Sequence, residues 1–223
     1  MGITHYGDRE RCFKCYRPKS SCMCGYIDSI ETETKFVILM HPKEFKKVKN
    51  NTGFFTHLSL HNSELFIGID FSKNQRIDEI IDTHESYILF PSDDALNLSK
   101  KGILEKQNRQ KPIAIFLIDS TWLCTKKLYT QSRNLNSLPH LSFETTMRSR
   151  YEIKEQPQEN FLSTIESTLV VLELLNKKGI ENIQESALEN FLRPFLKMIE
   201  YQKKQIESSP SSKVRYKYRE EKL

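Results

Sequence analysis

The stretch PIAIFLIDSTW, residues 112–122, decides the fold class. Its apolar run carries no charge until Asp119, and it continues straight into two hydroxyl residues and the chain's single tryptophan. Strands of a sheet that is covered on both faces read as such continuous apolar runs. Similar runs recur along the chain, with polar or amphipathic segments between them, which is the order of an α/β domain. We therefore predict a mostly parallel sheet with helices on both faces. The expected strands are residues 35–40, 64–69, 86–90, 112–118 and 140–143, and the expected helices are residues 43–61, 75–82, 93–99 and 121–134.

The C-terminal third has helical patterning. Ser163 with Glu166 three residues later predicts a capping box at the start of a helix that Gly179 ends. A second helix is expected at about 181–206, with a kink or a break at Pro194 because proline lacks a backbone N–H.

Composition limits the class of protein. A chain of 223 residues, 38% of them hydrophobic, can bury one medium-sized core. The apolar runs are too short to span a bilayer, and the polar N-terminus does not look like a signal peptide. We expect a soluble, cytoplasmic protein with no membrane partner. The net charge of +5 is concentrated in residues 203–223 and in a lysine cluster near residue 46. These regions are either polyanion-binding surfaces or, for the tail, a solvated and frayed end.

A cysteine-rich segment precedes the predicted sheet. Its spacing, C-x2-C-x6-C-x-C, can bring four thiolates into a tetrahedron around zinc. Four protein ligands leave no position for water, so the predicted metal is structural. The expected ligands are Cys12, Cys15, Cys22 and Cys24, whereas Cys124 is expected to be a core thiol.

Polar segments follow several of the predicted strands. The segments are HPKEFKKVKNNTG (41–53), LFPSDDA (89–95), DSTW (119–122) and LSFETTMRSRY (141–151). Ligands of open α/β sheets bind at the carboxyl ends of the strands, so these segments are the candidate site. The chain contains no G-x-G-x-x-G, P-loop, G-x-S-x-G or H-E-x-x-H motif, which argues against the common nucleotide-binding, serine-hydrolase and zinc-protease sites.

Each candidate also has a structural explanation. Asp119 or Ser120 could cap the following helix, and Trp122 could be a core anchor. Pro91 and Asp93 could form a turn. His41 could be a partly buried histidine that is hydrogen-bonded to the backbone.

Five blocks in order resemble one known family. They are the C-x2-C-x-R-P…C-x-C head, HPKE followed by NTG, LFPSDDA, DSTW and LSTIE, which together extend from Cys12 to about Gln202. This arrangement resembles the DTW-domain family, the tRNA-uridine aminocarboxypropyltransferases. The resemblance implies a knotted fold related to the SPOUT methyltransferases, with S-adenosylmethionine as cosubstrate. It implies transfer of the 3-amino-3-carboxypropyl group to N3 of a tRNA uridine, with tRNA as partner. The oligomeric state is open, and we slightly favour a monomer.

The resemblance assigns roles to residues of this chain. Asp119 is expected to be the general base or to orient the uracil edge, with Thr121 and Trp122 beside it as the other catalytic residues. The expected S-adenosylmethionine contacts are Leu89, Phe90, Pro91, Ser92, Ile118, Ser120 and Ser163. The expected RNA contacts are Lys43, Lys46, Lys47, Lys49, Asn51, Thr52, Arg148, Arg150 and Lys154. The expected units are a zinc-binding head with four cysteines at residues 1–30, the catalytic domain at 31–206 and a basic tail at 207–223.

One loop departs from the family pattern. Relatives typically have an arginine-rich run before the S-T-x-E block, and here Glu152, Lys154 and Glu155 occupy that run, although Pro157 is retained. Lysine keeps the charge but cannot form a bidentate fork. Two other readings remain: an RNA methyltransferase that uses the same cosubstrate, and a zinc-stabilised RNA-binding module without catalysis.

Overall fold

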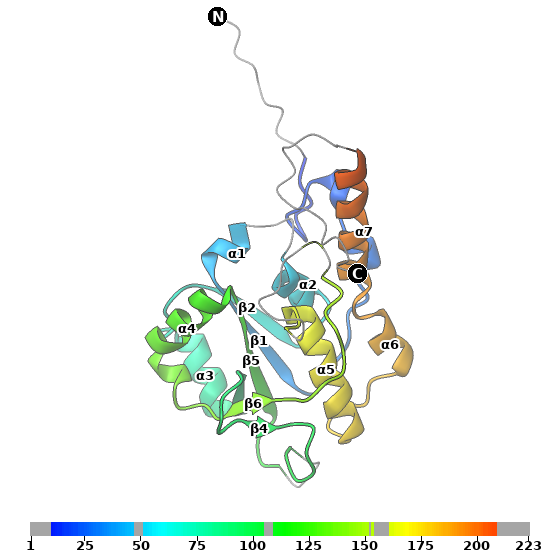
Figure 1. Ribbon diagram of the computed structural model, residues 1–223. Helices are drawn as coiled ribbons and strands as arrows, with labels where there is room; N and C mark the ends of the chain where they lie inside the picture. Colours follow the sequence, from blue (N-terminus) through cyan, green and yellow to red (C-terminus); the bar gives the residue numbers. More distant parts are fainter. Residues whose placement is uncertain (1–9, 47–50, 105–108, 152, 154–160, 209–223) are drawn as a thin grey trace, which may run out of the picture.

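A six-stranded, fully parallel sheet forms the centre of the molecule in the computed structural model (Figure 1). The structure describes residues 10–46, 51–104, 109–151, 153 and 161–208, with the backbone alone at Trp122. The strand order is β2-β1-β5-β3-β6-β4. The strands are β1 (Lys35–Met40), β2 (Ser63–Ile67), β3 (Glu85–Leu89), β4 (Leu96–Asn97), β5 (Ile113–Asp119) and β6 (His140–Ser142).

Strands β1 and β5 lie side by side in the interior of the sheet, which explains their uninterrupted apolar sequences. Phe36 and Phe116 are both fully buried, although their side chains belong to two different hydrophobic clusters. Successive side chains of a strand point to opposite faces, so alternate residues supply each cluster. Burial on both faces removes the polar alternation that a solvent-facing strand would show.

Helices cover both faces of the sheet (Figure 1). On one face, Ile77, Ile80 and Leu128 of α3 and α4 join the cluster that contains Phe116. On the other face, α2 and α5 pack against the sheet, and α6 and α7 lie outside them. The helices are α1 (Pro42–Lys46), α2 (Thr52–Leu58), α3 (Gln75–Thr83), α4 (Trp122–Gln131), α5 (Thr164–Lys177), α6 (Glu185–Asn190) and α7 (Arg193–Ser208).

The predicted α/β class and parallel sheet are confirmed, and the five expected strands are found to within a few residues. The helix predicted at 93–99 is wrong, because this segment contains β4. Leu96 pairs with Leu141 in the ladder, and the N–H of Leu98 donates to the carbonyl of Ser142 at 2.8 Å. The helix predicted at 43–61 is two helices, α1 and α2, and residues 47–50 between them lie outside the described part.

The C-terminal helices follow the sequence pattern closely. Ser163 and Glu166 form the predicted capping box of α5. The segment 181–206 is divided into α6 and α7, and Pro194 is the second residue of α7. Proline is tolerated in the first turn because its missing N–H would have no partner within the helix. The break between α6 and α7 therefore lies before Pro194.

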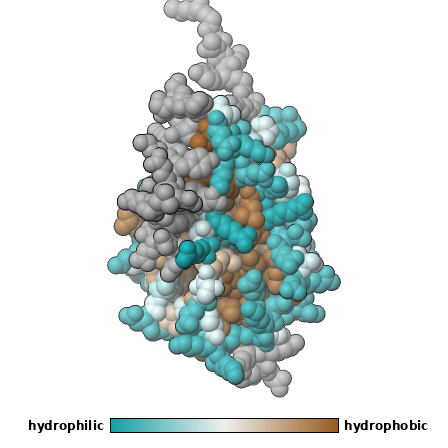
Figure 2. All heavy atoms as spheres, turned by 45° about the vertical axis from the view of Figure 1, so that its right-hand side comes forward, coloured by the Kyte–Doolittle hydropathy of each residue, from teal (hydrophilic) through white to brown (hydrophobic). Residues whose placement is uncertain are grey.

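The cysteine-rich head packs against α7 and α2. Its two short 3₁₀ helices are Lys19–Ser21 and Cys24–Tyr26. The guanidinium of Arg193 lies 5.7 Å from the ring centre of Tyr26, which joins the head to α7. On the face that carries α5, α6 and α7, hydrophobic side chains are visible in a band between hydrophilic ones (Figure 2). Of the helices in the described ranges, none is both long and apolar enough to cross a membrane.

An ion-pair network connects the edge strand β2 to β1 and α3. It predicts that the stability of the fold depends on pH. The carboxylate of Glu64 accepts from Arg76 at 2.7 Å and contacts Lys35 at 3.0 Å. The hydrogen bonds from Arg76 lower the pKa of Glu64 to about 2. Because the folded pKa lies below its ordinary value of 4.5, this stabilisation is present above pH 4.5 and is lost as the pH falls toward 2.

We expect Glu64→Gln to lower the free energy of unfolding by about 1 kcal/mol at pH 7, the upper range for partly exposed pairs. The difference from wild type should shrink between pH 4.5 and 2, measured by urea unfolding at each pH. Glu79→Gln is the matched control, since Glu79 also contacts Arg76 but its side chain is 59% exposed. A difference that stays constant down to pH 2 would contradict this prediction.

Candidate active site

The carboxyl ends of β1 and β5 form the centre of the candidate site. Met40 and Asp119, the last residues of these strands, lie opposite each other in the parallel register. Along β5, the side chains of Ile115 and Leu117 belong to the cluster on the α2 and α5 face. Strand alternation therefore directs Asp119 to the same face.

Asp119 is 7% exposed and is held by the start of α5. The hydroxyl of Thr164 donates a hydrogen bond to its Oδ1 at 2.6 Å. The N-cap of α4 is Thr121, and Asp119 is still part of β5. The alternative that Asp119 caps the following helix is therefore wrong, because its carboxylate faces another helix.

Gly53 lies directly against this carboxylate, and the sequence analysis did not single it out as a site residue. A Cβ atom added to Gly53 would lie 2.5 Å from both Cγ and Oδ2 of Asp119. The glycine of the NTG segment in α2 therefore creates the space that the carboxyl group occupies. The NTG, DSTW and LSTIE segments thus meet at one side chain.

Replacing Gly53 by alanine is expected to displace Asp119. Alanine is the better helix former by about 1 kcal/mol, but overpacking typically costs about 1–3 kcal/mol. We therefore expect a lower melting temperature in a thermal unfolding experiment. Gly25→Ala is the control, since a Cβ at Gly25 meets nothing within 4 Å. An unchanged or higher melting temperature for Gly53→Ala would contradict this prediction, because it would show that the Asp119 carboxylate can move aside without cost.

The turn between β5 and α4 presents hydroxyl groups. The hydroxyl of Ser120 is hydrogen-bonded to that of Thr125 at 2.6 Å, so Ser120 braces the first turn of α4. Thr121 is exposed, and its side chain makes no capping hydrogen bond. The first turn of α4 contains no acidic residue. Because the N-terminal N–H groups of a helix lack partners within it, this end of α4 is suited to a carboxylate. The side chain of Trp122 lies outside the described part.

His41 follows β1 beside Asp119. Its N–H donates to the carbonyl of Asp119 at 3.0 Å, and its ring Nδ1 accepts from the N–H of Lys43 at 3.1 Å. The ring is buried. The reading of His41 as a buried histidine that is hydrogen-bonded to the backbone is confirmed.

The loop after β3 is held by a chain of hydrogen bonds that the sequence analysis missed. The hydroxyl of Ser92 lies 2.6 Å from both Asp94 Oδ1 and His140 Nδ1, and His140 Nε2 lies 2.8 Å from the hydroxyl of Tyr129. Because the one proton of Ser92 goes to the carboxylate, a neutral His140 carries its proton on Nδ1 and accepts from Tyr129 on Nε2. Burial raises the pKa of Tyr129, which keeps its phenol as a donor.

Phe90 completes the attachment of this loop. Its ring stacks on that of Tyr129, with centroids 5.1 Å apart and an angle of 18° between the planes. Phe90 and Ile118 are both partly buried in the α3 and α4 cluster, whereas Leu89 packs against the opposite one. Pro91 is exposed. The predicted cosubstrate residues therefore lie on both sides of the sheet edge.

The fully buried carboxylate of Glu166 fixes another loop near the site. It accepts from the N–H and the hydroxyl of Ser163 at 2.8 and 2.6 Å, and from the N–H of Arg150 at 2.6 Å. Ser149 donates to it as well, at 3.0 Å. The capping box therefore also anchors the segment that carries the exposed side chain of Arg150. This places Ser163 in a structural role at the start of α5.

The predicted RNA contacts divide into three groups. Lys43, Lys46, Arg148 and Arg150 are exposed. Lys47, Lys49 and Lys154 lie outside the described residues, as do Glu152, Glu155 and Pro157. Asn51 and Thr52 are buried, at 6% exposure each, and Asn51 caps α2 by accepting from the N–H of Phe54 at 2.8 Å. Its amide nitrogen donates to the carbonyl of Glu44 at 3.0 Å. We therefore assign Asn51 to helix capping rather than to RNA contact.

The four head cysteines form a compact cluster. The sulfur atoms of Cys12 and Cys24 are 3.7 Å apart, as are those of Cys15 and Cys22, and all four lie within 4.8 Å of one another. A tetrahedron with Zn–S bonds of about 2.3 Å has sulfur atoms about 3.8 Å apart. The cluster therefore has the size and the donor set of a structural zinc site.

The environment of the cluster prepares it for metal. Hydrogen bonds from the backbone at Cys15 and Lys14 lower the pKa of Cys12 to about 6. Burial raises the pKa of Cys22 and Cys24. Of these three thiols, Cys12 therefore has the pKa most favourable to ionisation. Binding of a metal would replace the protons of the ligating thiols.

A family model for the DTW domain matches residues 9–203. The chain belongs to the DTW domain family. The Mus musculus protein named tRNA-uridine aminocarboxypropyltransferase 2 is 28% identical to this chain, over 91% of this chain and 66% of the mouse protein. The Macaca fascicularis protein of the same name is also 28% identical, over 87% of this chain and 64% of the macaque protein. A relative of the same name in Drosophila melanogaster is 27% identical over 87% of this chain and 75% of its own length. The chain thus spans just under two thirds of the mouse and macaque relatives. The search of solved structures gave no significant match.

Proposed function

We propose that this chain is a tRNA-modifying transferase that moves the 3-amino-3-carboxypropyl group of S-adenosylmethionine to N3 of a tRNA uridine. The observation that carries the proposal is the position of Asp119. Its carboxylate lies at the carboxyl end of the central strand β5, is hydrogen-bonded to Thr164, and occupies the space left by Gly53. The match to the DTW family and the names of the relatives support the same activity.

The proposed reaction needs a base and an aligned electrophile. Uridine N3–H is a weak acid, so Asp119 accepts its hydrogen bond and then its proton as N3 attacks. The new bond joins N3 to the carbon next to the sulfonium, the C–S bond breaks, and its electron pair goes to sulfur. Methylthioadenosine leaves, and the proton remains on the carboxyl group until solvent removes it. The hydrogen bond from Thr164 orients the carboxylate, which favours the reactive geometry.

The surroundings of Asp119 fit the cosubstrate chemically. The first turn of α4 offers backbone N–H groups to the carboxylate of the transferred group, and Ser120 and Thr121 offer hydroxyls. The loop that carries Phe90 and Ser92 is fixed by His140 and can therefore present a constant surface to the nucleoside. Within this proposal, the parallel sheet is a variant of the knotted SPOUT arrangement.

Exposed cations are the proposed contacts to tRNA phosphates. Lys43 and Lys46 extend from α1, and Arg148 and Arg150 come from the loop that Glu166 anchors. Phosphate contacts release counterions, so affinity for tRNA should fall steeply with salt concentration. We place this activity in the cytoplasm, with the protein acting as a monomer.

One experiment tests the proposed function. Unmodified tRNA is incubated with the zinc-loaded protein and S-adenosylmethionine, and the nucleosides are analysed by mass spectrometry. The expected products are aminocarboxypropyluridine and methylthioadenosine. A methylated nucleoside instead would identify a methyltransferase. Binding of tRNA without any product would favour a zinc-stabilised binding module.

A further inference from the structure

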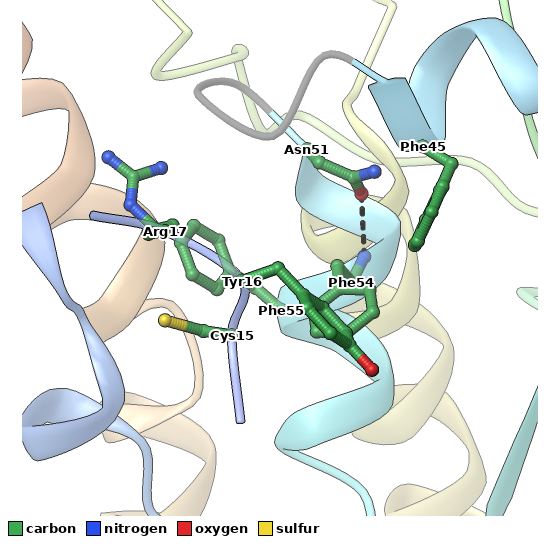
Figure 3. A pocket seen from close by; sticks show the side chains of 7 residues that line it. All are labelled: Cys15, Tyr16, Arg17, Phe45, Asn51, Phe54 and Phe55. Atoms are coloured by element: carbon green, nitrogen blue, oxygen red, sulfur yellow. Dashed lines mark hydrogen bonds between the residues drawn. The ribbon is translucent and has the colours of Figure 1, made fainter. Parts of the chain in front are cut away.

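A hollow between the cysteine head and α2 lies outside the site described above. It is an open depression of about 280 Å3, a volume that includes the solvent at its mouth. It is lined by Cys15, Tyr16, Arg17, Phe45, Asn51, Phe54 and Phe55 (Figure 3). Four of these side chains are aromatic. The ring of Tyr16 meets Phe54 edge to face at 5.5 Å and Phe45 at 6.1 Å. The hollow is shallow, so a flat group would stack at its mouth rather than enter fully.

Tyr16 occupies a backbone position that normally belongs to glycine. Its φ is 55°, in the left-handed region, and its N–H closes the turn by donating to the carbonyl of Cys12 at 2.8 Å. A bulky residue in this region is strained, and such strain is found mainly at functional sites. The ring is nevertheless 46% exposed, so burial in the core does not explain it. Phe13, in the same turn, is 94% exposed.

Exposed lysines adjoin these aromatic residues in the sequence. Lys14 lies between the two exposed aromatic residues in the sequence, and Lys46 follows Phe45; both lysines are exposed. The nearby acid Glu10 is paired with Lys19, and Glu44 is buried. Aromatic faces interleaved with cations bind single-stranded nucleic acid, because the rings stack on bases and the cations hold phosphates.

The hollow and the candidate active site lie on the same turn of α2. Gly53 contacts the Asp119 carboxylate, and the next residue, Phe54, lines the hollow. Consecutive residues of a helix point in directions about 100° apart, so the two sites lie on neighbouring faces of the same turn of α2. An unpaired RNA segment could therefore place its reacting uridine at one face and the adjacent nucleotide at the other.

We propose that the hollow formed by Tyr16, Phe45 and Phe54 is a stacking site for an unpaired tRNA base adjacent to the modified uridine. This inference rests on the proposed function, because it defines a second contact of the same substrate. It gives the cysteine head a direct part in substrate binding. It also explains why a tyrosine occupies a strained turn in which glycine would fold more easily.

The test uses Tyr16→Gly in the full-length, zinc-loaded protein. Glycine suits the positive φ, so this variant removes the ring without straining the turn. We expect the KM for unmodified tRNA to rise about 10-fold or more, the loss typical of one stacking contact, while the KM for S-adenosylmethionine and kcat change little. Tyr16→Phe, which retains the ring, should recover most of the affinity. Zinc content and melting temperature confirm that both variants are folded.

A binding measurement separates this inference from the proposed function. A single-stranded RNA that contains 2-aminopurine next to uridine should lose fluorescence on binding to wild type and to Tyr16→Phe, but not on binding to Tyr16→Gly. If wild type transfers the group and Tyr16→Gly has an unchanged KM for tRNA, the stacking site is refuted and the function stands. If wild type forms no product, the proposed function fails, and the fluorescence experiment still decides whether the hollow binds a base.

Discussion

Asp119→Asn is expected to lower kcat for aminocarboxypropyl transfer by about two to four orders of magnitude, the range typical of a lost general base. The amide cannot take the proton of uridine N3, but it matches the carboxylate in size. Its oxygen can still accept the hydrogen bond that Thr164 donates to Oδ1 at 2.6 Å. The substitution therefore removes the chemistry and leaves the packing around Gly53 nearly unchanged. The rate is measured by methylthioadenosine release under single-turnover conditions with saturating tRNA.

Thr164→Val provides the matched comparison. Valine has nearly the same shape as threonine but cannot orient the carboxylate, so we expect a loss of roughly 10-fold, about the effect of one hydrogen bond. Asp119 remains available as a base in this variant. A folded Asp119→Asn protein that retains full activity would exclude Asp119 as the base. An equal loss in both variants would indicate that orientation, rather than proton transfer, limits the rate.

The parallel sheet could be predicted because burial on both faces leaves a strong local pattern. Phe36 begins one run of consecutive apolar residues and Phe116 lies inside another, and such runs indicate both the strand and its burial on two faces. Strand β4 could not be predicted, because it is only Leu96–Asn97 and lies in a segment rich in turn-forming residues. Its pairing with β6 depends on contacts that are distant in the sequence.

The candidate site was predictable only in part. Asp119 could be selected as the polar end of an apolar strand, but the sequence did not distinguish a cap from an inward-facing carboxylate. That distinction depends on β5 extending to Asp119 and on Thr121 serving as the N-cap. The residues that contact Asp119, Gly53 and Thr164, belong to α2 and α5. A glycine that is needed only because a side chain distant in the sequence packs against it produces no periodic pattern in the sequence. The φ of 55° at Tyr16 could not be predicted from the sequence either.

Removal of the predicted zinc is expected to unfold the head and to weaken tRNA binding. Structural zinc sites bind with free energies on the order of 10 kcal/mol, and this energy is also folding energy. If zinc is the ion that joins these thiols, which lie in pairs 3.7 Å apart, its removal leaves the turn that carries Tyr16 without its main support. The contact of Arg17 with Phe55, 5.9 Å from guanidinium to ring centre, would open with it. We expect a chelator to lower the melting temperature and to release bound zinc.

Cys15→Ser should reproduce the effect of the chelator, because Cys15 is the buried member of the cluster. Cys124→Ser is the matched control: Cys124 lies in α4, outside the cluster, so its zinc content should equal that of wild type. Acid should release the metal as well, since protons compete for the thiolates. The core cluster on the α3 and α4 face contains no residue of the head, so we expect this part of the core to keep its own unfolding transition. Reduced wild-type protein that contains no zinc by elemental analysis, or Cys15→Ser protein that retains it, would contradict the assignment of the four cysteines as ligands.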